Sequence, residues 1–518
     1  MRLELLVAGH ARRTPDKTAV VLGERRVSYR QLHEGALRVA AGMQKLGVQA
    51  GDRVIGYLPN GIEFIQLMLG TFHLGAMLVP VNTRLTAKEL AYFAEDSQAK
   101  VVCVDSSSLA LLDAVADSFK GMHWVVTGQP RAGQIPFAEL ARHDVVKLPP
   151  IPVEHCEDCM VIYTSGTTGR PKGAIITMAN FIVNHAFVNA QDWGIAPHDV
   201  FLVTTPLAHR TGMARMMNSL CLGASLVVME RFDPAQTIEV IEKEKVSAIG
   251  MVPTIARMLL PTLKEAGQAA RCASLRHIIV TGEAFPVDVK KSVIGLLPQV
   301  ELHSFFAMTE VGAVTGLNHA EQFTHPASVG RVTPGVEVRI VDDAGREVPT
   351  GEAGELLVRT GAPGNFLTMR GYYKRPEETA KTIVDGWVHT GDMARFDEEG
   401  YMYIVDRKKD MVLSGGFNIY TKEVEQVLLE HAAVLDVAVV GVPDPIYGEA
   451  VTAFVELRQG EKLDAAGLIE HCRERIAGYK KPKYVFFVDA LPRNALGKVL
   501  KVPLREQAAQ NLASAANA

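Results

Sequence analysis

The chain has 518 residues, of which 48% are hydrophobic and 22% charged, and its formal net charge is -4. Its length exceeds what one hydrophobic core supports, so we expect two or more domains. The near-balanced charge argues against nucleic acid or an anionic membrane as the main partner, and six cysteines in so long a chain do not indicate a disulfide framework. The N-terminal residues lack the pattern of a secretory signal, and we expect a cytoplasmic protein.

Short β-branched runs alternate with helical stretches over the first four hundred residues. The segments "DRVIGYL", "AKVVCV", "HWVVTG" and "LRHIIVTG" are typical of strands, and "PAQTIEVIEKEK" has a helical period. The most hydrophobic window, residues 64–81, contains Gln66, His73 and Pro80, so we interpret it as a buried helix followed by a strand and not as a membrane span. This alternation predicts an α/β fold with largely parallel sheets.

The pattern changes from about Pro326, where short strands are separated by turns such as "DDAG" and "EEG". The segment "DRKKDMVLSGGFN", residues 406–418, joins a charged cluster to paired glycines and is typical of a hinge between domains. Helices and strands alternate again beyond it. We therefore expect a large N-terminal domain, residues 1–408, and a small α+β C-terminal domain, residues 409–518.

The stretch "YTSGTTGRPKG", residues 163–173, cannot contribute to a core, because it is rich in glycine and hydroxyl groups. A strand end precedes it and the strand "KGAIIT" overlaps its end, so it connects two strands. Its glycines let backbone N–H groups approach a ligand, and Lys172 adds a cation. Together these features favour a polyphosphate as the ligand. A Walker P-loop is excluded because a glycine and a strand follow Lys172. A flexible polar hairpin tip remains open as the alternative.

The same stretch closely resembles the signature of the adenylate-forming superfamily, which includes acyl- and aryl-CoA synthetases, peptide-synthetase adenylation domains and beetle luciferases. Further motifs of that superfamily follow in the same order along almost the whole chain: "PLAHRTG" at 206–212, "TGEAF" at 281–285, "AMTEVG" at 307–312, "GYYKRPEET" from 371, "WVHTGD" at 387–392, "SGGFNIYTKEVE" from 414 and "PRNALGK" at 492–498. The resemblance implies a distorted β-barrel region in the large domain and a mobile small domain. It also implies ATP, Mg²⁺ and coenzyme A as ligands.

For the nucleotide, the resemblance implies that Glu310 and Thr167 bind Mg²⁺ and that Thr309 contacts the α-phosphate. Asp392 is expected to accept hydrogen bonds from both ribose hydroxyls, with Arg407 beside it. The phosphate loop comprises Thr164, Ser165, Gly166, Thr167, Thr168, Gly169 and Lys172. The adenine pocket comprises Gly282, Glu283, Ala284, Ser304, Phe305, Phe306 and Ala307. Taken alone, Glu310 is equally typical of an acid that starts a helix after Thr309.

For the small C-terminal domain, the resemblance implies that Lys498 bridges the incoming carboxylate and the α-phosphate during adenylation. That reach requires domain closure, and the hinge position corresponds to Lys409. In the other orientation the small domain is expected to bind coenzyme A through Ser414, Gly415, Gly416 and Tyr447. Taken alone, a loop lysine such as Lys498 is typically solvated.

The acyl pocket is where the sequence departs from the superfamily. Phe306-Ala307 replaces the usual "YG", Met178 replaces a histidine, and Ala208 replaces an aromatic residue, while His209 is kept and is expected near the substrate carboxylate. Two sets of residues follow on the predicted helix. The methionines at helical spacing line the acyl pocket or form plain core: Met213, Met216 and Met217. The arginines pair with a second substrate carboxylate, form a structural ion pair or face solvent: Arg210 and Arg215.

These features predict an ATP-dependent acid–CoA ligase that releases pyrophosphate and AMP, acting on a medium- or long-chain fatty acid. An aryl or dicarboxylic acid is the alternative substrate, and loading of a carrier protein's phosphopantetheine is the alternative acceptor chemistry. The expected partners are the carboxylic acid, ATP and coenzyme A, with no integral membrane segment. A homodimer and a peripheral membrane contact remain open.

Overall fold

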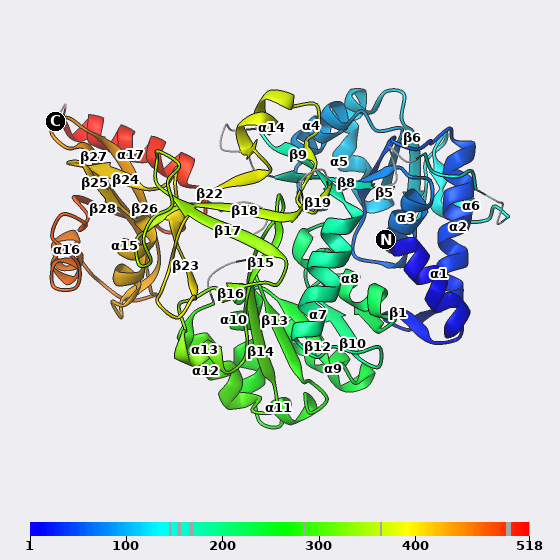
Figure 1. Ribbon diagram of the computed structural model, residues 1–518, viewed down its shortest axis with the longest axis horizontal. Coiled ribbons are helices and arrows are strands. Elements are labelled where there is room, and N and C mark those ends of the chain that lie inside the picture. Colours follow the sequence, from blue (N-terminus) through cyan, green and yellow to red (C-terminus); the bar gives the residue numbers. More distant parts are fainter. Residues whose placement is uncertain are drawn as a thin grey trace. The chain divides into compact units, whose positions relative to one another are not determined.

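The computed structural model describes residues 1–144, 148–152, 157–164, 170–282, 285–362, 365–493 and 499–516. The chain forms two compact units (Figure 1). The first comprises Met1–Val338, Leu357–His389 and Glu399–Met402, and the second comprises Arg339–Leu356, Thr390–Glu398 and Tyr403–Ala518. The domain boundary expected between residues 408 and 409 stays a prediction.

One sheet of the first unit carries the glycine-rich loop. Its strand order is β20-β9-β8-β4-β3-β5-β6-β7. The strands are β3 (Arg53–Tyr57), β4 (Met77–Pro80), β5 (Val101–Asp105), β6 (His123–Thr127), β7 (Ile135–Pro136), β8 (Asp158–Thr164), β9 (Lys172–Thr177) and β20 (Gly371–Tyr372). Strands β3 to β8 pair in parallel along this order, whereas β9 is antiparallel to β8 and to β20.

A second sheet has the strand order β16-β15-β14-β13-β12-β10-β11-β1-β2. Its strands are β1 (Thr18–Leu22), β2 (Arg25–Ser28), β10 (Val200–Val203), β11 (Ser225–Val228), β12 (Ala248–Met251), β13 (His277–Val280), β14 (Glu301–Met308), β15 (Gly312–Leu317) and β16 (Arg331–Val332). The strands from β14 to β1 are parallel, and antiparallel pairs lie at both ends of the order. The two sheets confirm the predicted α/β class.

Helices form three layers around these sheets, because each apolar strand face must be covered. The main core lies between the sheets and joins β4, β8 and β10 to the inner helices: α1 (Leu3–Arg13), α2 (Tyr29–Lys45), α3 (Ile62–His73), η4 (Asn180–Val188), α7 (Asn189–Asp192) and α8 (Arg210–Leu222). A second core covers the far face of the second sheet with α9 (Pro234–Glu244), α10 (Pro253–Lys264) and α12 (Val287–Leu296). A third covers the first sheet with α4 (Ala87–Ser97), α5 (Leu109–Leu112) and η2 (Asp113–Phe119).

A third sheet, with the strand order β17-β18-β22-β21, is a half-barrel form of the expected β-barrel region. Its strands are β17 (Val336–Val341), β18 (Gly354–Ala362), β21 (Ile383–Val384) and β22 (Trp387–Phe396), with β19 (Asn365–Phe366) beside β18 and β23 (Met402–Arg407) beside β22. Short helices complete the first unit: α6 (Phe137–Leu140), α11 (Gln268–Arg271), α13 (Glu321–Thr324) and α14 (Pro376–Thr382).

The C-terminal part of the second unit is the expected small α+β fold. Its sheet contains β24 (Val412–Ser414), β25 (Phe417–Ile419), β26 (Val434–Asp444), β27 (Gly448–Leu457) and β28 (Tyr484–Phe487). Helices α15 (Thr421–Leu429) and α16 (Ala465–Arg473) contribute to one core of this fold, and α17 (Lys501–Ala516) contributes to another. The window at residues 64–81 forms α3 followed by β4, as predicted, and no helix among the described residues is long and apolar enough to cross a membrane.

Candidate active site

The glycine-rich stretch connects two antiparallel strands, as predicted. Strand β8 ends at Thr164 and β9 begins at Lys172, and these two residues are register partners. The two ends of this loop therefore lie side by side. They fix the position at which the loop would hold a ligand. Ser165, Gly166, Thr167, Thr168 and Gly169 lie outside the described residues, so their predicted role stays a prediction.

Glu310 lies at the mouth of this loop. It occupies the turn between the antiparallel strands β14 and β15, where Met308 pairs with Gly312, so the alternative that it starts a helix is wrong. The Thr164 hydroxyl donates to Glu310 Oε1 at 3.2 Å, and the Tyr372 hydroxyl donates to the same oxygen at 3.3 Å. The carboxylate is thus held where the carboxyl ends of β8 and β14, one from each sheet, come together.

Tyr372 is a site residue that the sequence reasoning missed, although it lies within the quoted motif "GYYKRPEET". Burial and the adjacent Glu310 carboxylate raise the pKa of Tyr372, so its hydroxyl keeps its proton as a donor. Lys172 Nζ lies 5.2 Å from the centre of the Tyr372 ring and forms an ion pair with Glu378 of α14. Tyr372 therefore links the loop lysine to Glu310, and Glu378 neutralises the charge of the lysine.

Arg210 supports the turn that carries Glu310. It begins α8, and its guanidinium donates to the carbonyl of Thr309 at 3.0 Å and to the side chain of Asn180. Burial lowers its pKa to about 10, and the Glu310 carboxylate opposes that shift, so the group stays charged at neutral pH. Of the alternatives left open for Arg210, solvent exposure is wrong, because the residue is buried. Two of its guanidinium nitrogens donate to neutral backbone and amide oxygens, so the structure shows a structural contact without an ion pair, and pairing with a second substrate carboxylate stays a prediction.

His209 and the three methionines belong to the N-terminus and the buried length of α8. His209 is the N-cap of α8, and its Nδ1 accepts a hydrogen bond from the Thr211 N–H at 3.4 Å. The side chains of Met213, Met216 and Met217 are completely buried in the main core. Their role in an acyl pocket stays a prediction, because burial in this core is equally typical of plain packing.

Arg215, one turn further along α8, has a different environment from Arg210. Its side chain is 1% exposed, and its three guanidinium nitrogens have no hydrogen-bond partner among the described residues. The guanidinium carbon lies 5.1 Å from the Trp193 ring centre and 5.3 Å from that of Phe305. Burial lowers its pKa to about 9. A buried cation beside two aromatic rings is suited to bind an anionic or hydrogen-bond-accepting group.

The first predicted adenine segment follows the end of β13, and the second, residues 304–307, lies in the C-terminal half of β14. Gly282 has φ +100°, a conformation that favours glycine, and the Thr281 hydroxyl donates to the Phe305 carbonyl at 3.1 Å. The Ser304 hydroxyl accepts from the Gln322 amide at 2.9 Å. Phe306 and Ala307 are half-buried at the end of β14, and Glu283 and Ala284 lie outside the described residues. The structure thus brings the described members of this set onto two neighbouring parallel strands.

The second unit carries the predicted ribose residues. Asp392 is 2% exposed and forms an ion pair with Arg407, with Nε 2.6 Å from Oδ1. The two residues come from the neighbouring strands β22 and β23. The Arg407 guanidinium offsets part of the cost of burying this carboxylate. Arg407 therefore orients the carboxylate that the resemblance assigns to the ribose.

The predicted coenzyme A residues gather at one tight hairpin. Ser414 pairs with Phe417, and Gly415 and Gly416 form the turn with φ +58° and +82°, which is the geometry of a two-residue hairpin that glycine suits best. The Gly415 N–H donates to the Tyr447 carbonyl at 2.8 Å, and the Tyr447 ring is half exposed. Lys409 is exposed, as suits a hinge, and Lys498 lies outside the described residues.

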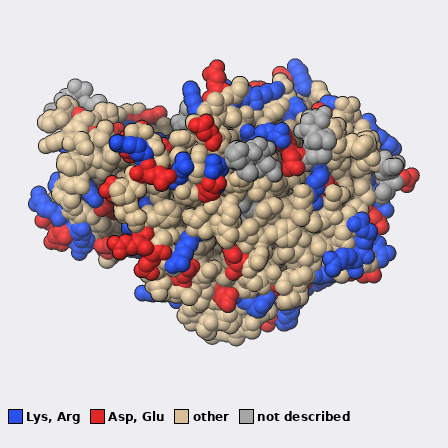
Figure 2. Space-filling view, in the orientation of Figure 1, with Lys and Arg blue, Asp and Glu red and all other residues tan. Residues whose placement is uncertain are grey.

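The charge of the visible surface is mixed. On the face drawn in Figure 2, lysine and arginine side chains are interspersed with aspartate and glutamate over both units. This distribution agrees with the small net charge of -4.

Comparison with known proteins identifies the family. The AMP-binding enzyme family matches residues 7–373, and the AMP-binding enzyme C-terminal domain matches residues 423–498. A long-chain-fatty-acid–CoA ligase of Bacillus subtilis is 32% identical, covering 98% of this chain and 95% of that protein. A feruloyl-CoA synthase of an Amycolatopsis species is 34% identical, covering 96% and 97%.

Among solved structures, ATP-bound MatB from Rhodopseudomonas palustris superimposes with a TM-score of 0.86 at 30% identity, covering 98% of this chain and 99% of that one. Fold and site define a nucleotide-dependent enzyme built on two large α/β sheets. The chain belongs to the AMP-binding enzyme family, which is the adenylate-forming superfamily that its motifs resemble.

Proposed function

We propose that this protein activates a medium- or long-chain fatty acid with ATP and transfers the acyl group to coenzyme A. The chain is an AMP-forming acid–thiol ligase. What we propose beyond this class is the identity of the acid, a fatty acid. The observation that carries it is the cluster of Thr164, Glu310 and Tyr372 at the carboxyl ends of β8, β14 and β20, with Lys172 beside them at the start of the antiparallel β9. Ligands of open α/β sheets bind at these strand ends.

The cluster fits the charges of the first half-reaction. A carboxylate oxygen of the acid attacks the α-phosphorus of ATP, and pyrophosphate leaves with the negative charge of the β- and γ-phosphates. Lys172 supplies a cation for those phosphates, and it becomes available when they displace Glu378 from its ion pair. Lys498 is proposed to neutralise the charge that develops between the acid and the α-phosphate.

The residues at the loop mouth also fit Mg²⁺, which this family implies. Mg²⁺ prefers one or two carboxylates together with phosphate oxygens, and Glu310 offers one carboxylate beside the Thr164 hydroxyl. When bound, the ion would neutralise phosphate charge. Arg210 fixes the backbone of Thr309, so the position of the neighbouring carboxylate does not depend on the ligand.

The second half-reaction uses the acyl-adenylate. The sulfur of coenzyme A attacks the carbonyl carbon, the thiol loses its proton, and AMP leaves from the same carbon. The hairpin at Gly415 and Gly416 has no side chain at its tip and exposes Tyr447 beside it. These features suit the approach of the pantetheine arm and stacking on the adenine of coenzyme A.

Two features support the choice of acid. The buried methionines Met213, Met216 and Met217 give α8 an apolar face suited to an alkyl chain, and relatives of this length include a long-chain-fatty-acid–CoA ligase. A second candidate is an acid that carries another anionic or hydrogen-bond-accepting group. It is favoured by Arg215, whose buried guanidinium has no hydrogen-bond partner among the described residues.

The test is a coenzyme A thioester assay with purified protein, ATP and Mg²⁺ over straight-chain, aromatic and dicarboxylic acids. Preference for straight chains supports the main proposal, whereas preference for acids with a distal carboxylate or carbonyl supports the second candidate. Pyrophosphate release that depends on the acid but not on coenzyme A isolates the first half-reaction. Failure to form AMP with any acid refutes both.

A further inference from the structure

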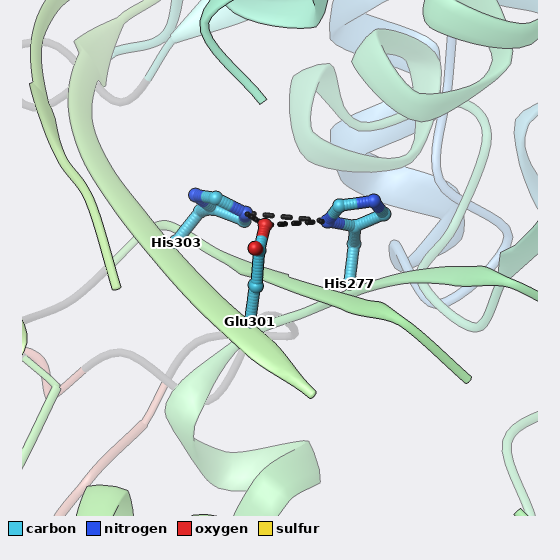
Figure 3. A group of neighbouring side chains, drawn as sticks. All are labelled: His277, Glu301 and His303. Carbon is cyan, nitrogen blue, oxygen red and sulfur yellow. Dashed lines mark hydrogen bonds and ion pairs between the residues drawn. The ribbon is translucent and has the colours of Figure 1, made fainter. Parts of the chain in front are cut away.

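The structure places three metal-binding side chains together on the second sheet, at the opposite end of its strands from Glu310. His277 is the first residue of β13, Glu301 is the first residue of β14, and His303 follows two residues later. His277 is the register partner of Glu301 in this parallel pair, so the three side chains project from one face of the sheet (Figure 3). The proposed ligase site does not use them.

The three donor atoms converge on one point. His277 Nδ1 lies 3.3 Å from His303 Nε2, and Glu301 Oε2 lies 3.5 Å from the first nitrogen and 3.6 Å from the second (Figure 3). A tetrahedral Zn²⁺ ion with bonds of roughly 2.1 Å needs ligand atoms about 3.4 Å apart. The observed triangle therefore already has the size of one face of that tetrahedron.

Contacts within this group of three side chains do not satisfy all of its hydrogen-bonding atoms. The two facing nitrogens and the carboxylate oxygen contact one another, while the far nitrogens, His277 Nε2 and His303 Nδ1, are buried with no hydrogen-bond partner in the described part of the chain.

The surroundings hold the histidines in place and leave one side open. The His303 ring packs against Trp193 with ring centres 5.8 Å apart, and both histidines are at least 96% buried, whereas the Glu301 side chain is 59% exposed. The nearby Arg276 is paired with the buried Asp199 at 2.5 Å, so its charge does not stand unopposed next to a cation. Solvent reaches the triangle from the Glu301 side.

We propose that His277, Glu301 and His303 bind a divalent transition-metal ion of the Zn²⁺ class, with a water molecule as the fourth ligand on the exposed side. Two imidazoles and one carboxylate are a ligand set that this class accepts, in contrast to the oxygen ligands preferred by Mg²⁺. The ion ties β13 to β14 at their amino ends. Seven residue steps along β14, at ~3.3 Å each, put it roughly 23 Å from the turn that carries Glu310. It is therefore separate from the nucleotide site.

The test uses chelator-treated full-length protein and CoCl₂ or ZnCl₂ alone, with no nucleotide. We expect one Co²⁺ per chain with the intense visible bands of tetrahedral coordination, and loss of those bands when Zn²⁺ is added. Glu301→Gln removes one ligand from an exposed position and leaves the core intact, so we expect affinity to fall by about tenfold or more. His277→Gln is the second variant, and Glu239→Gln, an exposed glutamate on α9, is the matched control.

Thermal unfolding provides a second readout. Binding to the folded state raises Tm with metal concentration in the parent protein and in Glu239→Gln, and this rise is smaller or absent in Glu301→Gln. The proposal is overturned if the protein binds no stoichiometric Co²⁺. It is also overturned if both ligand variants bind Co²⁺ as tightly, and with the same spectrum, as the parent.

Discussion

Replacing Arg215 with methionine tests whether the charge of Arg215 serves substrate recognition or the stability of the fold. Arg215 is fully buried beside Trp193 and Phe305, and its guanidinium has no hydrogen-bond partner among the described residues. Methionine has a similar length and follows the same path past Gly250, where a Cβ would lie 2.2 Å from Arg215 Cγ. The substitution therefore removes the charge while keeping the packing.

The magnitude follows from the cost of burying the charge. Lowering the pKa from 12.5 to about 9 corresponds to roughly 5 kcal/mol of unfavourable free energy for the charged form in the folded state. Two desolvated cation–π contacts offset this cost by about 2 kcal/mol each at most. The substitution is therefore expected to raise the free energy of unfolding by about 1–3 kcal/mol and Tm by a few °C.

The measurement is thermal unfolding of the ligand-free protein, together with kcat/KM for each acid in the thioester panel. Arg210→Met is the matched control on the same helix. It removes the donors to Thr309 and Asn180, so it is expected to lower Tm. If Arg215 recognises a second acceptor on the acid, Arg215→Met lowers kcat/KM for such acids about 100-fold and leaves simple fatty acids nearly unchanged.

An unpaired, destabilising Arg215 is ruled out if Arg215→Met lowers Tm as much as Arg210→Met does. That result would mean that the folded protein already pairs the guanidinium with an acceptor, and that no substrate group is needed to satisfy it. Unchanged discrimination between acids, together with a raised Tm, would remove the second substrate candidate and leave the fatty acid proposal.

Three further outcomes are expected. Glu310→Gln keeps an acceptor for Thr164 and Tyr372 but loses the negative charge, so acid-dependent pyrophosphate release should fall about 100-fold with little change in Tm; an unchanged rate would contradict the role in Mg²⁺ binding. Lys498→Ala should suppress adenylation far more than thioester formation from preformed acyl-adenylate, and an equal loss in both would contradict the assignment. Burial lowers the pKa of His73 to about 4, so between pH 6.5 and 4 the unfolded state binds more protons, and stability falls by about 3 kcal/mol as the pH falls through this window. Denaturant titrations of the parent and His73→Gln at pH 7 and 4.5 check this, since the variant should lose less stability.

The local pattern of the sequence determined the elements that carry the site. The alternation of β-branched runs and helical periods predicted the α/β class, and glycine and hydroxyl content predicted that residues 163–173 connect two strands. These inferences succeed because strand periodicity and turn chemistry depend on residues close together in the chain. The order of motifs likewise indicated the family before any contact was known.

The tertiary structure alone decided what each charged group touches. Arg210 and Arg215 lie five residues apart on one helix, yet one holds the Thr309 turn and the other has no hydrogen-bond partner in the described chain. The sequence left open whether Glu310 starts a helix or binds a ligand. In the structure it lies in a β-turn beside Thr164. Such outcomes depend on strand register and on burial, which bring together residues 99 and 146 positions apart in these two contacts and set the cost of leaving a charge unpaired.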